Sequence, residues 1–176
     1  MSEIKNKIKF ISINIAVLTV SDTRSFETDT SGALLEKKLT EFGHTVLYRE
    51  IVKDDLNQIV KKLKSWIKDD GVDVIITTGG TGVTKRDITP EAFRLVVDKE
   101  IPGFGEYFRW VSIKSIGTST IQSRATAGVA DKTYLFSLPG SNGAVKDAWE
   151  KILKFQLDVR HKPCNFIELI PRLKDV

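Results

Sequence analysis

The sequence is poor in the residues that build the commonest metal and redox sites. Cys164 is its only cysteine, so no intrachain disulfide can form, and a reduced, cytoplasmic setting fits best. His44 and His161 are its only histidines, and their separation along the chain argues against a histidine-based zinc site or catalytic triad. Any chemistry therefore has to rest on other side chains and on the backbone.

Long hydrophobic runs and dense basic runs are also missing. No segment is long and apolar enough to span a bilayer. The formal net charge is +4, which favours an anionic ligand. The lysines, however, are spread over predicted helix faces and are not interleaved with aromatic residues. We therefore expect a small anionic ligand, and neither a membrane nor a nucleic acid as partner.

What the sequence does contain is an alternation of strands and helices. Its 176 residues, 41% of them hydrophobic, suit one globular domain. The alternation predicts a three-layer α/β/α domain over residues 13–171, after a charged tail at residues 1–12. Its sheet should be mostly parallel, with one antiparallel edge strand from a hairpin around Ala130-Asp131. The periodicities predict strands at 13–20, 45–52, 72–77, 124–129 and 132–138, and helices at 31–42, 56–70, 90–97, 106–114 and 144–157.

The most informative stretch is TTGGTGVTKRDITP at residues 77–90. It follows a short β-branched apolar run and ends on a proline at the expected first turn of a helix. Gly79, Gly80 and Gly82 permit positive φ and let a ligand approach the backbone N–H groups closely. Neighbouring hydroxyls, among them those of Thr78 and Thr81, add hydrogen-bond donors. The run matches neither the Walker A pattern nor the dinucleotide fingerprint, so it predicts an anion-binding loop of another kind.

Other loops should converge on the same edge of the sheet, because parallel strands bring their carboxyl-end loops to one side. These are residues 21–25, which include Ser21, residues 53–55, and residues 139–142. The last loop opens a helix and offers a second place for an anion. Glu106 and Arg124 are further polar candidates near the site, and an arginine can bind phosphate through its guanidinium group.

Asp54 and Asp87 are the candidate metal ligands. Both follow strands whose loops meet, and two carboxylates near bound phosphates suit Mg²⁺. Each has a plainer alternative. Asp54 or Asp55 caps the following helix, just as Thr30 or Ser31 caps the first one. Asp87 could instead form an ion pair with the neighbouring Arg86.

At these residues the chain closely resembles the MoaB/MogA family of molybdenum cofactor biosynthesis proteins. The resemblance extends from about residue 15 to about residue 171. Segments 116–130 and 160–166 look more like the MoaB branch than the MogA branch. The motifs are the glycine run at 77–87 with ITPEA at 88–92, PGFGE at 102–106, IGTST at 116–120, SR at 123–124 and LPGS at 138–141.

The resemblance implies a three-layer α/β fold with a mixed sheet and the binding of molybdopterin, a phosphorylated pterin dithiolene. MogA-type members transfer AMP from Mg-ATP to the terminal phosphate of molybdopterin. Two family aspartates important for that activity match Asp54 and Asp87, and the family's phosphate loop matches residues 79–82. MogA-like proteins are trimers, and MoaB-like proteins are often hexamers built as dimers of trimers.

The complete glycine run and the Arg86-Asp87 pair favour a molybdopterin adenylyltransferase, with Asp54 and Asp87 as catalytic and magnesium-binding residues. The alternative is a non-catalytic molybdopterin-binding or carrier protein of the same pathway. The expected partners are molybdopterin, ATP, further copies of the chain in a homotrimer or hexamer, and a molybdenum-insertion protein. The expected phosphate- and substrate-binding residues are Ser21, Thr78, Gly79, Gly80, Thr81, Gly82, Glu106, Ser123, Arg124, Pro139, Gly140, Ser141 and Asn142.

Overall fold

The computed structural model describes residues 3–4 and 8–174, and its centre is a six-stranded sheet in the order β3-β2-β4-β7-β6-β5. Strands β2, β3, β4 and β7 run parallel to one another, and β6 runs antiparallel to both β7 and β5. The strands are β2 (Asn14–Val20), β3 (Thr45–Val52), β4 (Val74–Thr78), β5 (Lys99–Glu100), β6 (Thr126–Ala130) and β7 (Thr133–Leu138).

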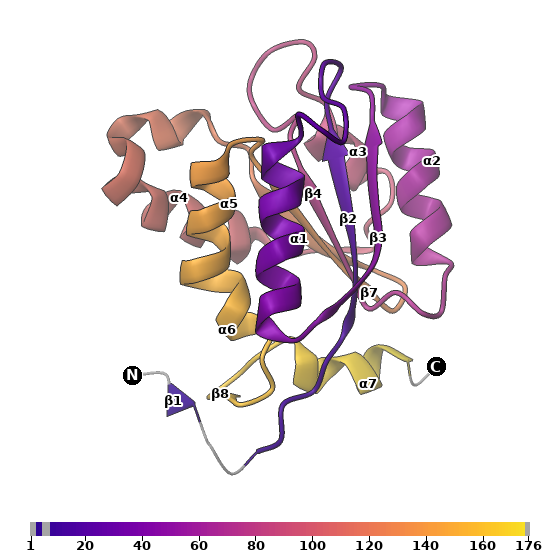
Figure 1. Cartoon of the computed structure of the whole chain (residues 1–176), viewed down its shortest axis with the longest axis vertical. Coiled ribbons are helices and arrows are strands. Elements are labelled where there is room, and N and C mark those ends of the chain that lie inside the picture. Colours follow the sequence, from indigo (N-terminus) through magenta and orange to yellow (C-terminus); the bar gives the residue numbers. More distant parts are fainter. Residues whose placement is uncertain (1–2, 5–7, 175–176) are drawn as a thin grey trace.

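Helices cover both faces of this sheet (Figure 1). One face packs against α1, α4 and α5, and the other packs against α2 and α3. The central strands are therefore buried on both sides and read as continuous apolar runs. In β2, Ile15 and Val17 face the first layer while Ala16 and Leu18 face the second. The helices are α1 (Thr30–Phe42), α2 (Leu56–Ile67), α3 (Thr89–Arg94), α4 (Pro102–Ile116) and α5 (Asn142–Ala148).

Shorter elements complete the fold. The turn η1 (Gly117–Gln122) follows α4, and a π-helical stretch η2 (Trp149–Leu153) leads from α5 into α6 (Lys154–Gln156). The chain ends with η3 (Ile167–Leu169) and α7 (Ile170–Lys174), and β1 (Glu3–Ile4) pairs antiparallel with β8 (His161–Lys162). Residues 1–2 and 5–7 of the predicted tail lie outside the described residues. No described helix is long and apolar enough to cross a membrane.

The predicted three-layer fold is confirmed, including the antiparallel strand on one side of the sheet. That strand is β6, and the two-residue β5, which was not predicted, lies outside it. One helix start differs from expectation. A helix was predicted at residues 106–114, but α4 begins at Pro102. Proline suits the first turn of a helix because its missing N–H would have no partner there.

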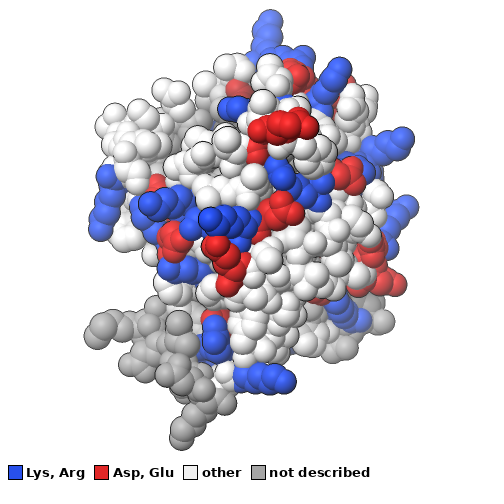
Figure 2. Space-filling view, viewed as in Figure 1, with Lys and Arg blue, Asp and Glu red and all other residues white. Residues whose placement is uncertain are grey.

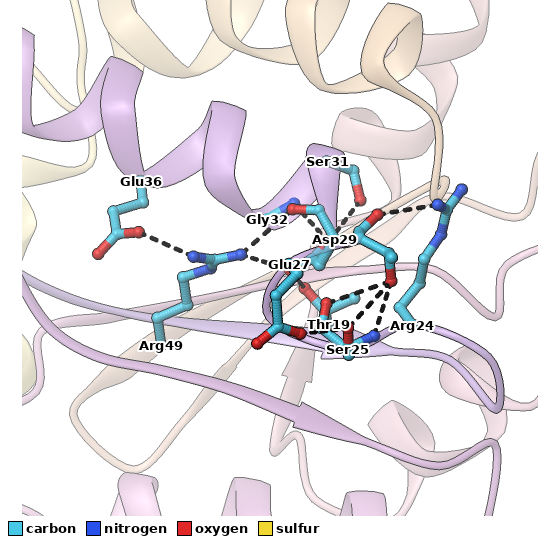
Figure 3. Close-up of polar contacts among 10 residues, drawn as sticks. Thr19, Arg24, Ser25, Glu27, Asp29, Ser31, Gly32, Glu36 and Arg49 are labelled. Carbon is cyan, nitrogen blue, oxygen red and sulfur yellow. Dashed lines mark hydrogen bonds and ion pairs between the residues drawn. The ribbon is translucent and has the colours of Figure 1, made fainter.

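The first helix is capped by Asp29, so the expected cap at Thr30 or Ser31 is wrong. The Asp29 carboxylate accepts the Gly32 N–H at 2.9 Å. It is fixed in place by two further contacts, from the Thr19 hydroxyl at 2.8 Å and the Arg49 guanidinium at 3.0 Å (Figure 3). Burial alone would raise the pKa of Asp29, but these hydrogen bonds together hold that pKa below its ordinary value. The buried partners, which are distant in sequence, select Asp29 as the cap.

The charged surface agrees with the scattered lysines of the sequence. On the face shown in Figure 2, Lys and Arg side chains are interspersed with Asp and Glu. Ion pairs such as Lys38–Glu150 and Lys154–Glu150 explain part of this mixture. The face carries no extended patch of one sign of the kind that binds nucleic-acid phosphates.

Candidate functional site

A cavity of about 620 Å³ lies where the carboxyl ends of β4 and β7 meet α4, η1 and α5. It brings together many residues that the sequence predicted from separate loops. Asp87 lies on its wall beside the glycine run. The predicted binding residues that line it are Gly79, Gly80, Thr81, Gly82, Ser123, Pro139, Gly140 and Ser141.

The glycine loop has a backbone that only glycine tolerates well. Gly79 and Gly80 have φ values of 104° and 64°, in the left-handed region. A Cβ at Gly79 would collide with the Val20 carbonyl oxygen, and one at Gly80 would collide with the Thr89 hydroxyl. Substitution at either position would therefore force the loop to move.

Thr89 holds this loop in place from the start of α3. Its hydroxyl donates to the Gly79 carbonyl at 2.9 Å, and its N–H donates to the Gly80 carbonyl at 3.0 Å. The Gly79 N–H is also occupied, since it donates to Leu138 at 2.9 Å. Within the described part of the chain, the N–H groups of Gly80 and Thr81 donate to nothing. They remain available to an anion in the cavity.

Asp54 is free of the capping role, because Asp55 caps α2 by accepting the Gln58 N–H at 2.9 Å. The Asp54 Oδ1 atom lies 3.2 Å from the position that a Cβ would take on Gly80. Burial, and then the nearby Asp22 carboxylate, raise the pKa of Asp54 above its ordinary value. The crowded carboxylate is therefore costly in its charged form, and a bound cation would relieve that cost.

Asp87 does not pair with Arg86. Its Oδ2 atom accepts the Thr84 N–H at 2.9 Å and the Thr84 hydroxyl at 2.6 Å. Burial would raise the pKa of Asp87, but these hydrogen bonds outweigh it and keep the pKa below the ordinary value. Arg86 forms an ion pair with Asp22 instead, and the other Asp22 oxygen accepts the Asp54 N–H at 3.3 Å. The loops after β2, β3 and β4 are thus joined through one carboxylate.

Arg124 has other partners than the predicted phosphate. Its Nε donates to the Gly82 carbonyl at 2.6 Å and its Nη2 donates to the Asp87 carbonyl at 2.5 Å. Its third nitrogen pairs with Glu91. In this geometry Arg124 supports the glycine loop from the side and does not point a free guanidinium group at the cavity.

The remaining predicted residues lie around the cavity and do not line it. Thr78 is fully buried and donates its hydroxyl to the Pro139 carbonyl at 3.2 Å, which ties two loops together. The Ser21 hydroxyl accepts from the backbone of residues 23 and 24. Glu106 lines a separate cavity of about 300 Å³ together with Arg124. Asn142 is exposed at the start of α5.

One wall of the cavity was missed from the sequence. It comes from α4 and η1, and helical periodicity does not indicate which face of a helix borders a cavity. Two charged residues of α5, Lys146 and Asp147, also line the cavity. Asp22 was missed as well, since only the fold shows that it contacts Asp54 and Arg86. The lining residues from α4 and η1 are Phe108, Ser112, Ser115, Ile116, Ser119 and Gln122.

Asp54 and Asp87 suit Mg²⁺ better than a metal that needs a full set of protein ligands. The described residues hold no group of three or more His, Cys, Asp or Glu side chains that could bind an ion. Mg²⁺ binds through one or two carboxylates and takes its remaining ligands from phosphate and water. The donor set at the loop therefore fits a magnesium ion that arrives with a phosphorylated ligand.

These observations define the class of the protein. It is a three-layer α/β domain with a glycine-loop cavity at the carboxyl edge of its sheet. A family model described as "Probable molybdopterin binding domain" matches residues 16–159. The chain belongs to this family, which includes the MoaB and MogA proteins of molybdenum cofactor biosynthesis.

Relatives and solved structures agree with this assignment. The chain is 49% identical over 166 residues to molybdenum cofactor biosynthesis protein B of Escherichia coli K12, covering 94% of this chain and 96% of that protein. A crystal structure of a molybdenum cofactor biosynthesis protein B superposes with a TM-score of 0.85 at 41% identity, over 94% of this chain and 98% of that one. The tungsten cofactor synthesizing protein MoaB from Pyrococcus furiosus gives 0.71 at 40% identity, with coverages of 80% and 90%.

Proposed function

We propose that the protein is a molybdopterin adenylyltransferase, which transfers AMP from Mg-ATP to the terminal phosphate of molybdopterin. The observation that supports this most directly is the glycine loop. Its available N–H groups at Gly80 and Thr81 lie on the same loop as the Asp87 carboxylate, and the Asp54 carboxylate approaches Gly80 from the loop after β3. The relatives are named for molybdenum cofactor biosynthesis, the pathway to which this reaction belongs.

In this reaction the protein itself forms no covalent bond to the substrates. A terminal phosphate oxygen of molybdopterin attacks the α-phosphorus of ATP in line, a new P–O bond forms, and the bond to the leaving pyrophosphate breaks. The protein has to hold the two phosphates together and neutralise their repulsion. The N–H groups of Gly80 and Thr81 would bind phosphate oxygens, and Arg124 would keep the loop in shape through its contacts with the Gly82 and Asp87 carbonyls.

Asp54 and Asp87 would hold the magnesium ion. When bound, the ion supplies positive charge beside the phosphate oxygens. Asp87 is ready for this role because its lowered pKa keeps it ionised. The Asp22 carboxylate, bonded to both Arg86 and the Asp54 N–H, would set where Asp54 sits relative to the loop.

The test is Asp87→Asn, which keeps an oxygen for Thr84 but removes the charge. Molybdopterin binding should survive, while pyrophosphate release from Mg-ATP should fall by roughly a hundredfold or more, as expected when a group that stabilises transition-state charge is lost. The control is Asp147→Asn, since Asp147 lines the same cavity but pairs with Lys151. Full turnover by Asp87→Asn would remove Asp87 from the mechanism.

A second candidate is a binding or carrier protein that holds molybdopterin and transfers nothing. It is favoured by one observation: Asp54 is not among the residues that line the cavity, whereas Asp87 is. The cavity could therefore hold a phosphorylated pterin with only one carboxylate engaged. The decisive measurement is pyrophosphate release in the presence of molybdopterin. Its absence at every magnesium concentration would favour the carrier.

The predicted homotrimer or hexamer has support from exposed apolar side chains on one helix. Tyr107, Trp110, Ile113 and Ile116 are each about half exposed along α4, and Ile121 follows in η1. Such a surface is typical of a contact between subunits. Sedimentation equilibrium checks the assembly, and a monomer at all concentrations would contradict it. The molybdenum-insertion protein stays a predicted partner.

A further inference from the structure

Ser112 is the most unusual polar residue on the cavity wall. It lies in α4, is only 2% exposed, and lines the 620 Å³ cavity. Its hydroxyl has no hydrogen-bond partner among the described residues. Buried hydroxyls are nearly always hydrogen-bonded, because an unpaired one costs desolvation energy without return. The Oγ atom is itself buried, so the side chain has to turn toward the cavity before the hydroxyl can bond a ligand there.

The usual local explanation does not apply to Ser112. A serine inside a helix commonly bonds back to the carbonyl four residues earlier, which would be that of Phe108. No such bond forms here. By contrast, the nearby Ser115 hydroxyl is contacted by the Lys151 ammonium group at 3.4 Å. Ser112 thus keeps both its donor and its acceptor capacity for the cavity.

Two walls of the cavity differ chemically, and a third wall, from α5, adds the charged residues Lys146 and Asp147. The loop wall offers the N–H groups of Gly80 and Thr81 and the Asp87 carboxylate. The helix wall, formed by α4, η1 and Ser123 directly after η1, contributes only uncharged groups. Hydroxyls and one amide alternate there with apolar side chains, namely Phe108, Ser112, Ser115, Ile116, Ser119, Gln122 and Ser123. An elongated ligand with a phosphate at one end and a flat, uncharged, hydrogen-bonding ring at the other would match both walls.

We propose that Ser112 is a ligand-binding residue that hydrogen-bonds the uncharged ring end of the substrate while the glycine loop holds its phosphate end. The inference rests on the proposed function, in which that substrate is the phosphorylated pterin. Ser112 takes no part in the bond-making step. It contributes to affinity and to the choice of the ring.

Ser137 provides a matched control. It is also fully buried with an unpartnered hydroxyl, but it lies in β7 and lines none of the cavities described above. Ser112→Ala and Ser137→Ala therefore each delete one orphaned buried hydroxyl. Both should leave thermal stability unchanged or raise it, since an unsatisfied group is removed. Only Ser112→Ala should lower the affinity for the ligand.

The experiment measures dissociation constants for molybdopterin and for inorganic pyrophosphate, which has no ring. In Ser112→Ala the constant for molybdopterin should rise roughly tenfold, the value of one good hydrogen bond. The constant for pyrophosphate should not change, and Ser137→Ala should match the wild type with both ligands. Ser112→Cys, which is slightly larger and has a weak donor, provides a second variant should Ser112→Ala fold poorly, and it should lose affinity in the same selective way.

Several outcomes would overturn the proposal. Wild-type affinity for molybdopterin in both Ser112 variants would show that the hydroxyl does not touch the ring. Equal losses for molybdopterin and pyrophosphate would show a general disturbance of the cavity, as would an equal loss in Ser137→Ala. Failure of the wild-type protein to bind molybdopterin would refute the proposed function itself, and the inference would fall with it. Failure to bind pyrophosphate would count against the glycine loop as the phosphate end.

Discussion

Two clusters that each combine aspartate with arginine lie at the carboxyl end of β2, and they differ in how their charges are satisfied. In the first, Asp29 is buried and accepts hydrogen bonds from Thr19, Gly32 and Arg49 (Figure 3). In the second, at the open end of the sheet, Asp54 sits near other carboxylates, and its backbone is bonded to Asp22. The same residue types are therefore satisfied by hydrogen bonds in one place and crowded by like charge in the other.

The pKa values of Asp29 and Asp54 shift in opposite directions because of this difference. Hydrogen bonds lower the pKa of Asp29 despite its burial. Burial and the Asp22 carboxylate raise the pKa of Asp54. A carboxylate that the protein has already satisfied stabilises the fold, whereas one left crowded by like charge has a reason to bind a cation. Asp29 therefore stabilises the fold, and the raised pKa of Asp54 supports the proposal that Asp54 binds a cation.

The largest effect is expected from Asp29→Ala. Arg49, whose side chain is only 15% exposed, would lose its buried partner, and α1 would lose its cap. The free energy of unfolding at neutral pH should fall by about 3 kcal/mol or more, as measured by urea denaturation. Asp29→Asn keeps one acceptor oxygen and should lose less. If the urea midpoint for unfolding of Asp29→Ala equalled that of the wild type, the structural role of Asp29 would be contradicted.

The pH dependence of this stabilisation has a definite sign. Because the folded-state pKa of Asp29 lies below 3.8, its contribution is fully present above that ordinary value. It should disappear as the pH falls through the folded-state pKa. The difference between wild type and Asp29→Asn should therefore shrink only in strong acid.

Asp54→Asn should behave in the opposite way. The folded-state pKa of Asp54 lies above 3.8, so its ionised form costs stability at neutral pH, and that cost vanishes as the pH falls below the ordinary value. The variant should therefore be as stable as wild type or slightly more stable at neutral pH, with the difference closing in acid. Urea denaturation over a pH series measures this. A clear loss of stability at neutral pH would make Asp54 structural and would end the contrast with Asp29.

The sequence predicted the parts of this picture that depend on local pattern. The glycine run, the strand before it and Pro90 after it are all contiguous, so their order alone indicates an anion loop. The alternation of strands and helices likewise predicted the layers and the edge where the loops meet. The choice of Asp55 over Asp54 as a cap remained open, because adjacent aspartates are equivalent until the helix start is fixed.

What the sequence did not predict depends on contacts between distant segments. Asp29 caps α1 because Thr19 and Arg49 hold it there, and neither lies close to it in sequence. Arg124 contacts the backbone of the glycine loop, some forty residues away, in place of the predicted phosphate. Ser112 could not be singled out from the sequence, because no periodicity tells which helix face borders a cavity.

Arg86→Gln should have the smallest effect on stability. It also tests the contrast between the Asp29 and Asp54 clusters most closely. The Arg86 side chain is 65% exposed, so loss of its ion pair with Asp22 should change the free energy of unfolding by less than about 1 kcal/mol. The pKa of Asp54 should nevertheless rise further, because the Arg86 guanidinium lowers it in the wild type and Asp22 would be left unpaired. An NMR titration of the Asp54 carboxyl carbon measures that shift.

Lys132→Gln, which breaks a surface pair with Asp70 outside this cluster, should leave the Asp54 titration unchanged. An unchanged or lower pKa of Asp54 in Arg86→Gln would show that Arg86 and Asp22 do not act on the Asp54 carboxylate, and the explanation given for its raised pKa would fail.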